Sequence, residues 1–169
     1  MDRGVELREF VSARGAALSR AAYLLTGDHQ AAEDLVQETY VVLVRRWQKS
    51  GAVDPEAYVR RILYTRFVDG WRRRRLWELP WLSPPDAAGG HDEASTVTDR
   101  LTLQEALAQL TPRQRAVLVL RFYEDLTEVQ AAAALGISAN TVKSQTRLAL
   151  RRLRELAPEA VASFEGVES

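Results

Sequence analysis

The sequence contains no cysteine and only two histidines, His29 and His91, which lie far apart along the chain. The lack of cysteine excludes a disulfide framework, thiol catalysis and cysteine-ligated zinc, and it fits a reducing compartment. Neither histidine belongs to a metal-binding or phosphate-binding motif, so we expect no metal and no cofactor. No carboxylate pair lies in an apolar setting that would tune an acid or a base, so the sequence does not predict an enzyme.

Long apolar runs are also missing. No segment is long enough to span a bilayer, and the first ten residues carry charges where a signal peptide has its apolar segment. We therefore expect no membrane insertion and a cytoplasmic location. The chain has 169 residues, of which 46% are hydrophobic, enough for one medium domain or two small ones.

The formal net charge is zero, but charges of each sign are clustered. Basic side chains dominate residues 60–75 and 143–154, whereas acidic side chains gather in residues 6–38 and 78–99. Two basic segments on a neutral chain predict two contacts with nucleic acid, and the acidic segments indicate a further partner.

Apolar residues recur at helical spacing over most of the chain, so we expect an all-α fold. Residue types that cap helices mark the expected boundaries, namely Gly27, Asp28, Asp54 with Pro55, Thr111 with Gln114, Thr127 with Gln130, Gly136 and Ser138. Proline, glycine and acidic residues replace the periodicity in the middle of the chain. The sequence thus predicts two small helical domains, 1–77 and 99–157, joined by a flexible linker at 78–98 and followed by a tail at 158–169.

Segment 126–155 has the pattern of a helix-turn-helix, with small residues where two helices meet and Gly136 at the turn. Polar residues near the start of the second helix can reach base edges, and arginines further along can hold phosphates. The predicted DNA contacts are Ser138, Asn140, Thr141, Lys143, Ser144, Arg147 and Arg151. The alternative is an ordinary amphipathic helix pair with a solvated basic face.

Segment 54–75 interleaves aromatic residues with arginines, a composition that binds single-stranded DNA through base stacking and phosphate contacts. The alternative is that its aromatic side chains belong to the core and its arginines are solvated. The predicted contacts are Arg60, Arg61, Tyr64, Thr65, Phe67, Trp71, Arg72, Arg73, Arg74 and Arg75.

Three segments resemble the sigma-70 family. Residues 31–47 resemble region 2.2, residues 54–75 resemble regions 2.3 and 2.4, and residues 110–155 resemble region 4. The arrangement of regions 2 and 4, with a short linker and no further domain between them, resembles the extracytoplasmic-function subgroup. The resemblance implies a sigma factor, which directs bacterial core RNA polymerase to specific promoters and helps to open the DNA.

The resemblance also implies roles for individual residues. The helix that contains Asp34, Gln37, Glu38, Tyr40 and Trp47 would dock on the clamp helices of the polymerase. Segment 54–75 and the loop before it would bind and melt the −10 element, and the last domain would sit on the flap and recognise the −35 element. The linker would run towards the active-site cleft. Thr65 stands where many relatives have asparagine.

Two questions stay open at the level of sequence. One is whether an anti-sigma factor is a further partner. The other is whether the protein is instead a conventional helix-turn-helix regulator, which binds duplex DNA without polymerase. That alternative leaves the basic segment 60–75 and the acidic face around Asp34 unexplained.

Overall fold

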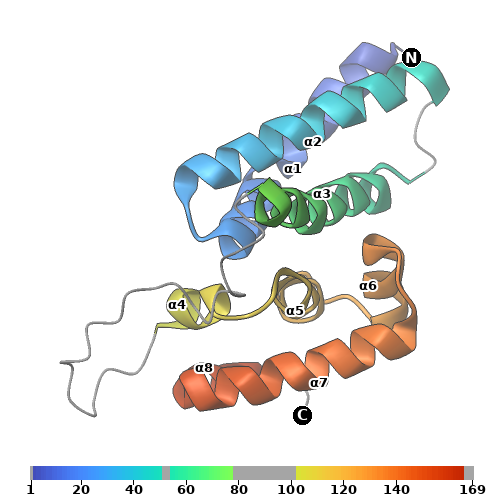
Figure 1. Cartoon of the computed structure of the whole chain (residues 1–169). Coiled ribbons are helices and arrows are strands. Elements are labelled where there is room, and N and C mark those ends of the chain that lie inside the picture. The colour runs from blue at the N-terminus through green and yellow to red at the C-terminus, as the bar shows by residue number, and fades with distance from the viewer. Residues whose placement is uncertain (1, 51–53, 78–101, 166–169) are drawn as a thin grey trace.

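The computed structural model describes residues 2–50, 54–77 and 102–165, and within these ranges the chain is helical, without strands. The expected all-α fold is confirmed (Figure 1). The elements are α1 (Arg3–Thr26), α2 (His29–Ser50), α3 (Pro55–Trp77), α4 (Leu103–Ala108), α5 (Pro112–Leu118), the π-helical turn η1 (Val119–Tyr123), α6 (Glu128–Leu135), α7 (Ala139–Leu156) and α8 (Pro158–Glu165).

The turn between α1 and α2 forms because two residue types meet there. Gly27 adopts a φ of 70°, which glycine tolerates without strain, and its N–H donates to the carbonyl of Tyr23 at 2.8 Å. Asp28 then caps α2, because its carboxylate accepts the N–H of Ala31 at 2.8 Å. The two helices therefore run back along each other.

Capping boxes define the starts of α5 and α6, as the sequence predicts. Thr111 accepts the N–H of Gln114 at 3.2 Å, and the Gln114 side chain accepts the N–H of Thr111 at 3.3 Å. Thr127 and Gln130 repeat this reciprocal pair at 3.2 and 2.9 Å. Gly136 ends α6 with a φ of 66°, the left-handed conformation that the tight turn into α7 requires.

The first module, α1 to α3, packs around side chains such as Leu25, Leu43 and Leu63, which are fully buried. The second module, α4 to α8, does not form a separate body. Apolar residues of α5, η1 and α6, including Val117 and Leu120, belong to the same continuous core. Figure 1 shows α3 between α2 above and the helices α5 and α6 below, and α3 contacts all three.

The C-terminal segment differs from the expectation. The sequence predicts a tail from residue 158, but α8 occupies most of it and packs against α7. Ala157 and Val161 are each 2% exposed and join a second core cluster with Leu107 and Leu153. Pro158 is the first residue of α8, where the backbone N–H has no partner within the helix, so a proline costs nothing there. The buried residues of α8 extend the core of the second module beyond α7.

This packing predicts the effect of substitutions in α8. Val161→Ser removes a buried apolar side chain and leaves a hydroxyl in its place, so the free energy of unfolding should fall by about 1–3 kcal/mol. Ala162→Ser is the matched control, because Ala162 is exposed on the same helix; it should change that free energy by about 0.5 kcal/mol or less. Urea unfolding followed by circular dichroism measures both values. Equal effects of the two substitutions would show that α8 does not stabilise the module.

Candidate nucleic-acid interface

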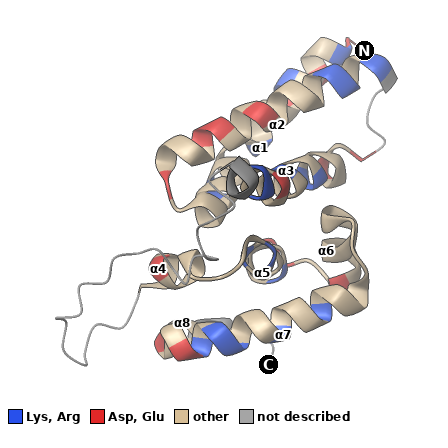
Figure 2. Cartoon of the chain, in the orientation of Figure 1, with Lys and Arg blue, Asp and Glu red and all other residues tan. Residues whose placement is uncertain are grey.

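Helix α7 presents one polar face to solvent. Val142, Ala149 and Leu153 are fully buried and fix the rotation of the helix. The opposite face is exposed and consists of Asn140, Lys143, Ser144, Arg147 and Arg151. The structure thus brings most of the predicted DNA contacts of this helix together on one face. Figure 2 marks the positions of the basic residues along the ribbon of α7.

Local hydrogen bonds divide these residues into two groups. Ser138 caps α7 by accepting the N–H of Thr141 at 3.1 Å, and the two hydroxyls lie 2.8 Å apart. Ser144 donates to the carbonyl of Asn140 at 2.9 Å. Lys143 and Arg147, in contrast, have no ion pair with any carboxylate in the described ranges. Their charge is available for phosphates or base edges, whereas Ser138 also has a structural role.

Helix α3 divides its predicted contacts between surface and interior. Arg61, Arg72 and Arg73 are exposed, and Trp71 is half-buried near the end of the helix. Arg74 and Arg75 continue α3, but their side chains lie outside the described residues, as do residues 51–53 of the loop before the helix. Thr65 donates to the carbonyl of Arg61 at 2.6 Å, so its hydroxyl is already bonded within the helix.

Two aromatic residues predicted to contact DNA are in the core. Tyr64 is fully buried and Phe67 is 6% exposed. Phe67 also lies beneath the guanidinium of Arg115 from α5, 5.9 Å from the ring centre. In this arrangement neither ring offers a face for stacking, because the second module covers this side of α3.

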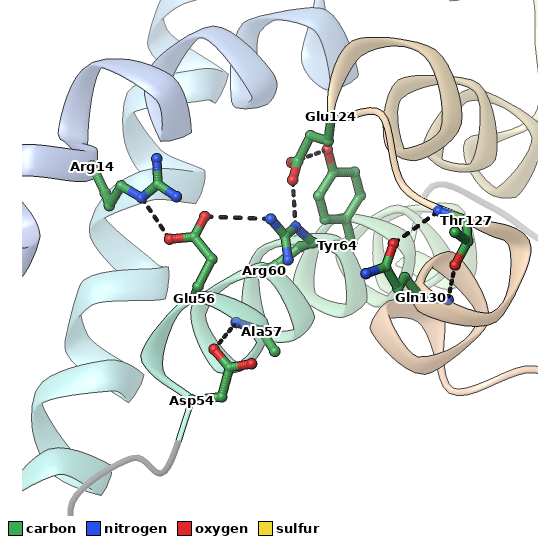
Figure 3. A network of polar contacts seen from close by, with 9 residues as sticks. All are labelled: Arg14, Asp54, Glu56, Ala57, Arg60, Tyr64, Glu124, Thr127 and Gln130. Atoms are coloured by element: carbon green, nitrogen blue, oxygen red, sulfur yellow. Dashed lines mark hydrogen bonds and ion pairs between the residues drawn. The ribbon is translucent and has the colours of Figure 1, made fainter.

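Glu124, which directly follows η1, forms the polar contacts that join the second module to this side of α3. Its carboxylate accepts the hydroxyl of Tyr64 at 2.6 Å and forms an ion pair with Arg60 (Figure 3). Arg60 also pairs with Glu56 at 3.3 Å, and Glu56 pairs with Arg14 of α1. Burial, followed by the charge of Glu124, raises the pKa of Tyr64 well above its usual range, so the phenol remains protonated as the hydrogen-bond donor.

Two further contacts from the second module reach the end of α1. Arg115 donates to the carbonyl of Leu25, and Gln104 donates to that of Tyr23 at 3.4 Å. Burial lowers the pKa of Arg115 to about 10. Sequence reasoning missed Glu124, Arg115 and Gln104, because a helical pattern carries no signal for contacts across about 60 to 100 residues.

Helix α2 carries the acidic face expected to meet the polymerase. Asp34, Gln37 and Glu38 are exposed, and Glu38 forms only a long ion pair with Arg66, at 3.7 Å. Val41 and Val44 lie beside them on the same helix with exposed fractions of 50% and 36%. Acidic residues next to exposed apolar ones form a surface suited to a protein partner, and the helical periodicity of the sequence does not distinguish these valines from core positions.

Two residues predicted on that face lie elsewhere. Trp47 is 6% exposed, and its ring lies 6.0 Å from that of Phe10 in the core of the first module. Tyr40 is half-buried, and burial raises its pKa. The structure gives Trp47 a packing role in this conformation, because a large aromatic ring contributes most when it is removed from water.

Two negative findings apply to the described residues. None of their helices combines the length and the apolar character that a membrane span requires. No group of three or more histidine, aspartate or glutamate side chains in these ranges is placed to hold a metal ion.

The sequence matches two family descriptions in order. Residues 10–76 match Sigma-70 region 2, and residues 106–155 match Sigma-70, region 4. The chain is 41% identical over 154 residues to an RNA polymerase sigma-E factor from Streptomyces avermitilis, covering 89% of this chain and 84% of that protein. It is 35% identical over 158 residues to the ECF RNA polymerase sigma factor SigL from Mycobacterium tuberculosis, covering 88% and 86%.

Two solved structures are similar to this chain over most of its length. The chain is similar to the sigma factor RpoE from Bartonella quintana, solved in complex with the anti-sigma factor NepR, with a TM-score of 0.66 and 25% identity. That likeness covers 89% of this chain and 96% of that one. CnrH, solved in complex with the cytosolic domain of CnrY, shares the fold with a TM-score of 0.59 and 23% identity over 89% and 86% of the two chains.

Proposed function

The chain belongs to the sigma-70 family, in its extracytoplasmic-function (ECF) subgroup, and from that premise we propose how its surfaces act. It is an RNA polymerase sigma factor, which directs the core enzyme to promoters and promotes DNA opening. The observation that carries this function is the 41% identity to a sigma factor over 89% of the chain. The polymerase supplies the chemistry, and this protein supplies recognition in the cytoplasm.

Helix α2 is the surface we assign to core polymerase. Asp34, Gln37 and Glu38 supply negative charge, and Val41 supplies exposed apolar area beside them. A positively charged, partly apolar partner surface would complement this face, as the clamp helices are expected to do. The linker and the second module would then follow the enzyme surface towards the flap.

Two surfaces are assigned to promoter DNA. The exposed face of α7 would enter the major groove at the −35 element, with Lys143 and Arg147 as the main contacts. The exposed arginines Arg61, Arg72 and Arg73 of α3 would hold the strand at the −10 element. We also propose an anti-sigma factor as a regulatory partner, since the similar RpoE was solved with one.

Reconstituted transcription tests this assignment. Core polymerase with this protein should start transcripts at specific sites in a genomic library, and the protein without polymerase should not select them. On a promoter so recovered, Lys143→Ala and Arg147→Ala should each weaken −35 recognition. A lost base contact should cost about 1–3 kcal/mol, and a lost phosphate contact should lower the salt slope by about one. Run-off assays at several salt concentrations measure both.

Arg152→Ala is the matched control for charge. Arg152 is exposed on α7 but pairs with Glu155 and lies off the face that carries Arg147. Its substitution should leave promoter use unchanged, and all three variants should bind core polymerase as the parent does. Selection of the same sites by the protein alone would favour a duplex-binding regulator. Unchanged activity of both face variants would place recognition outside α7.

Opening of the −10 element is the second property to test. Unpairing a base costs a few kcal/mol, and contacts available only on the open strand must offset that cost. Replacing Arg72 and Arg73 together with alanine should reduce open complexes on duplex DNA. A template already unpaired at the −10 element should restore much of the transcript yield, because the opening cost has been removed. Permanganate footprinting of unpaired thymines reports opening directly.

The matched control replaces Arg3 and Arg8, two exposed arginines of α1, with alanine. It removes the same charge without touching α3 and should open duplex DNA normally. If the α3 variant opens duplex DNA as well as this control does, the arginines at the end of α3 are a solvated face and take no part in melting.

A further inference from the structure

The contact between the two modules occupies the same side chains that the promoter strand would need. Arg60 and Glu124 form an ion pair between modules, and their side chains are only 18% and 16% exposed. The hydroxyl of Tyr64 donates to the second carboxylate oxygen of Glu124 at 2.6 Å. Figure 3 shows both donors, from successive turns of α3, pointing at one carboxylate that comes from the other module.

A carboxylate in this position resembles a nucleic-acid phosphate in its chemistry. Both are anions with two or more acceptor oxygens, and both suit a guanidinium and a hydroxyl as paired donors. Arg60 and Tyr64 would therefore bind a backbone phosphate with the same atoms that they now direct to Glu124. As long as Glu124 is in place, that binding is excluded.

The backbone that presents Glu124 is unusual. It follows the π-helical turn η1, and the N–H of Glu124 donates to the carbonyl of Val119 at 3.0 Å. The next residue, Asp125, has a φ of 53°, the only non-glycine residue with positive φ in the described ranges. Isolated π turns and left-handed non-glycine residues are costly and are retained where the surrounding structure or a function requires them.

Promoter geometry requires the modules to separate. The −10 and −35 elements lie about 25 base pairs apart, which is about 85 Å of duplex. In this structure α3 contacts α6 and α6 contacts α7, which places the axes of α3 and α7 within about 20 Å of one another. One molecule in this arrangement cannot place α3 on one element and α7 on the other.

We propose that Glu124 is an autoinhibitory latch, which keeps the free protein closed by occupying Arg60 and Tyr64 in place of a DNA phosphate. The proposal rests on the sigma-factor function for its DNA ligand. Opening exposes these two donors together with the arginines of α3, and it leaves Glu124 in solvent. The latch thereby couples separation of the modules to the availability of the strand-binding surface.

The test uses the full-length chain without polymerase. Because the sequence has no cysteine, Glu9→Cys on α1 and Glu155→Cys on α7 provide two unique exposed sites for a fluorescent donor and acceptor. Glu124→Gln should lower energy transfer relative to the parent, and Glu124→Arg, which repels Arg60, should lower it further. Affinity for a short single-stranded DNA oligonucleotide, measured by fluorescence anisotropy, should rise about threefold to tenfold with Glu124→Gln as the open population grows.

Glu128→Gln is the matched control, since it removes the same charge from the same module and Glu128 contacts no residue of α3 through a described ion pair. It should change neither energy transfer nor oligonucleotide affinity. Circular dichroism confirms that each variant keeps its helices, and a cooperative melt confirms that it remains folded.

Unchanged energy transfer in both Glu124 variants would overturn the latch, whatever the protein does in transcription. Reduced transfer without a gain in oligonucleotide affinity would overturn the competition between Glu124 and phosphate. Failure of the sigma-factor function has a different signature, because reconstituted transcription by the parent protein would then produce no specific start sites.

Discussion

Packing of the second module onto α3 is the contact on which the rest of the structure depends. The apolar side chains of α5, η1 and α6 complete a core that α1 to α3 leave open on one side, and each module is small for a stable domain of its own. Polar contacts at the edge of this interface are specific: Arg115 and Gln104 bond to the end of α1, Arg20 of α1 donates to the hydroxyl of Tyr123, and Glu124 binds two residues of α3.

The same contact explains why α3 has a divided surface. The ion pair of Arg60 and Glu124 is partly buried, and desolvation of both charges offsets part of their attraction, so the shared apolar core supplies most of the free energy that holds the modules together. The modest contribution of Glu124 is still enough to change a small open population several-fold, and it favours the face of α3 that the second module covers. Arg60, Tyr64 and Phe67 lie under that cover, whereas Arg61, Arg72 and Arg73 remain exposed. The helix thus serves both packing and promoter binding, and separation of the modules decides between the two.

Much of the local structure could be predicted from the sequence, because its causes are local. The capping boxes at Thr111 and Thr127 and the glycine turns at Gly27 and Gly136 are signals a few residues long, and each occurs where expected. The burial of Tyr64, Phe67 and Trp47 could not be predicted, since an aromatic residue on a basic helix fits either the core or a stacking surface. The pairing of Arg60 with Glu124 depends on how two modules meet, which periodicity does not encode.

The most direct test of this account is the distance between the modules in two states of the same protein. Spin labels at Glu9→Cys and Glu155→Cys report that distance by pulsed electron paramagnetic resonance, in the free chain and in the open complex with core polymerase and promoter DNA. We expect a single narrow distance distribution in the free chain, which is replaced in the complex by one longer by several tens of ångströms, as the spacing of the two promoter elements requires. The same distance in both states would contradict this account.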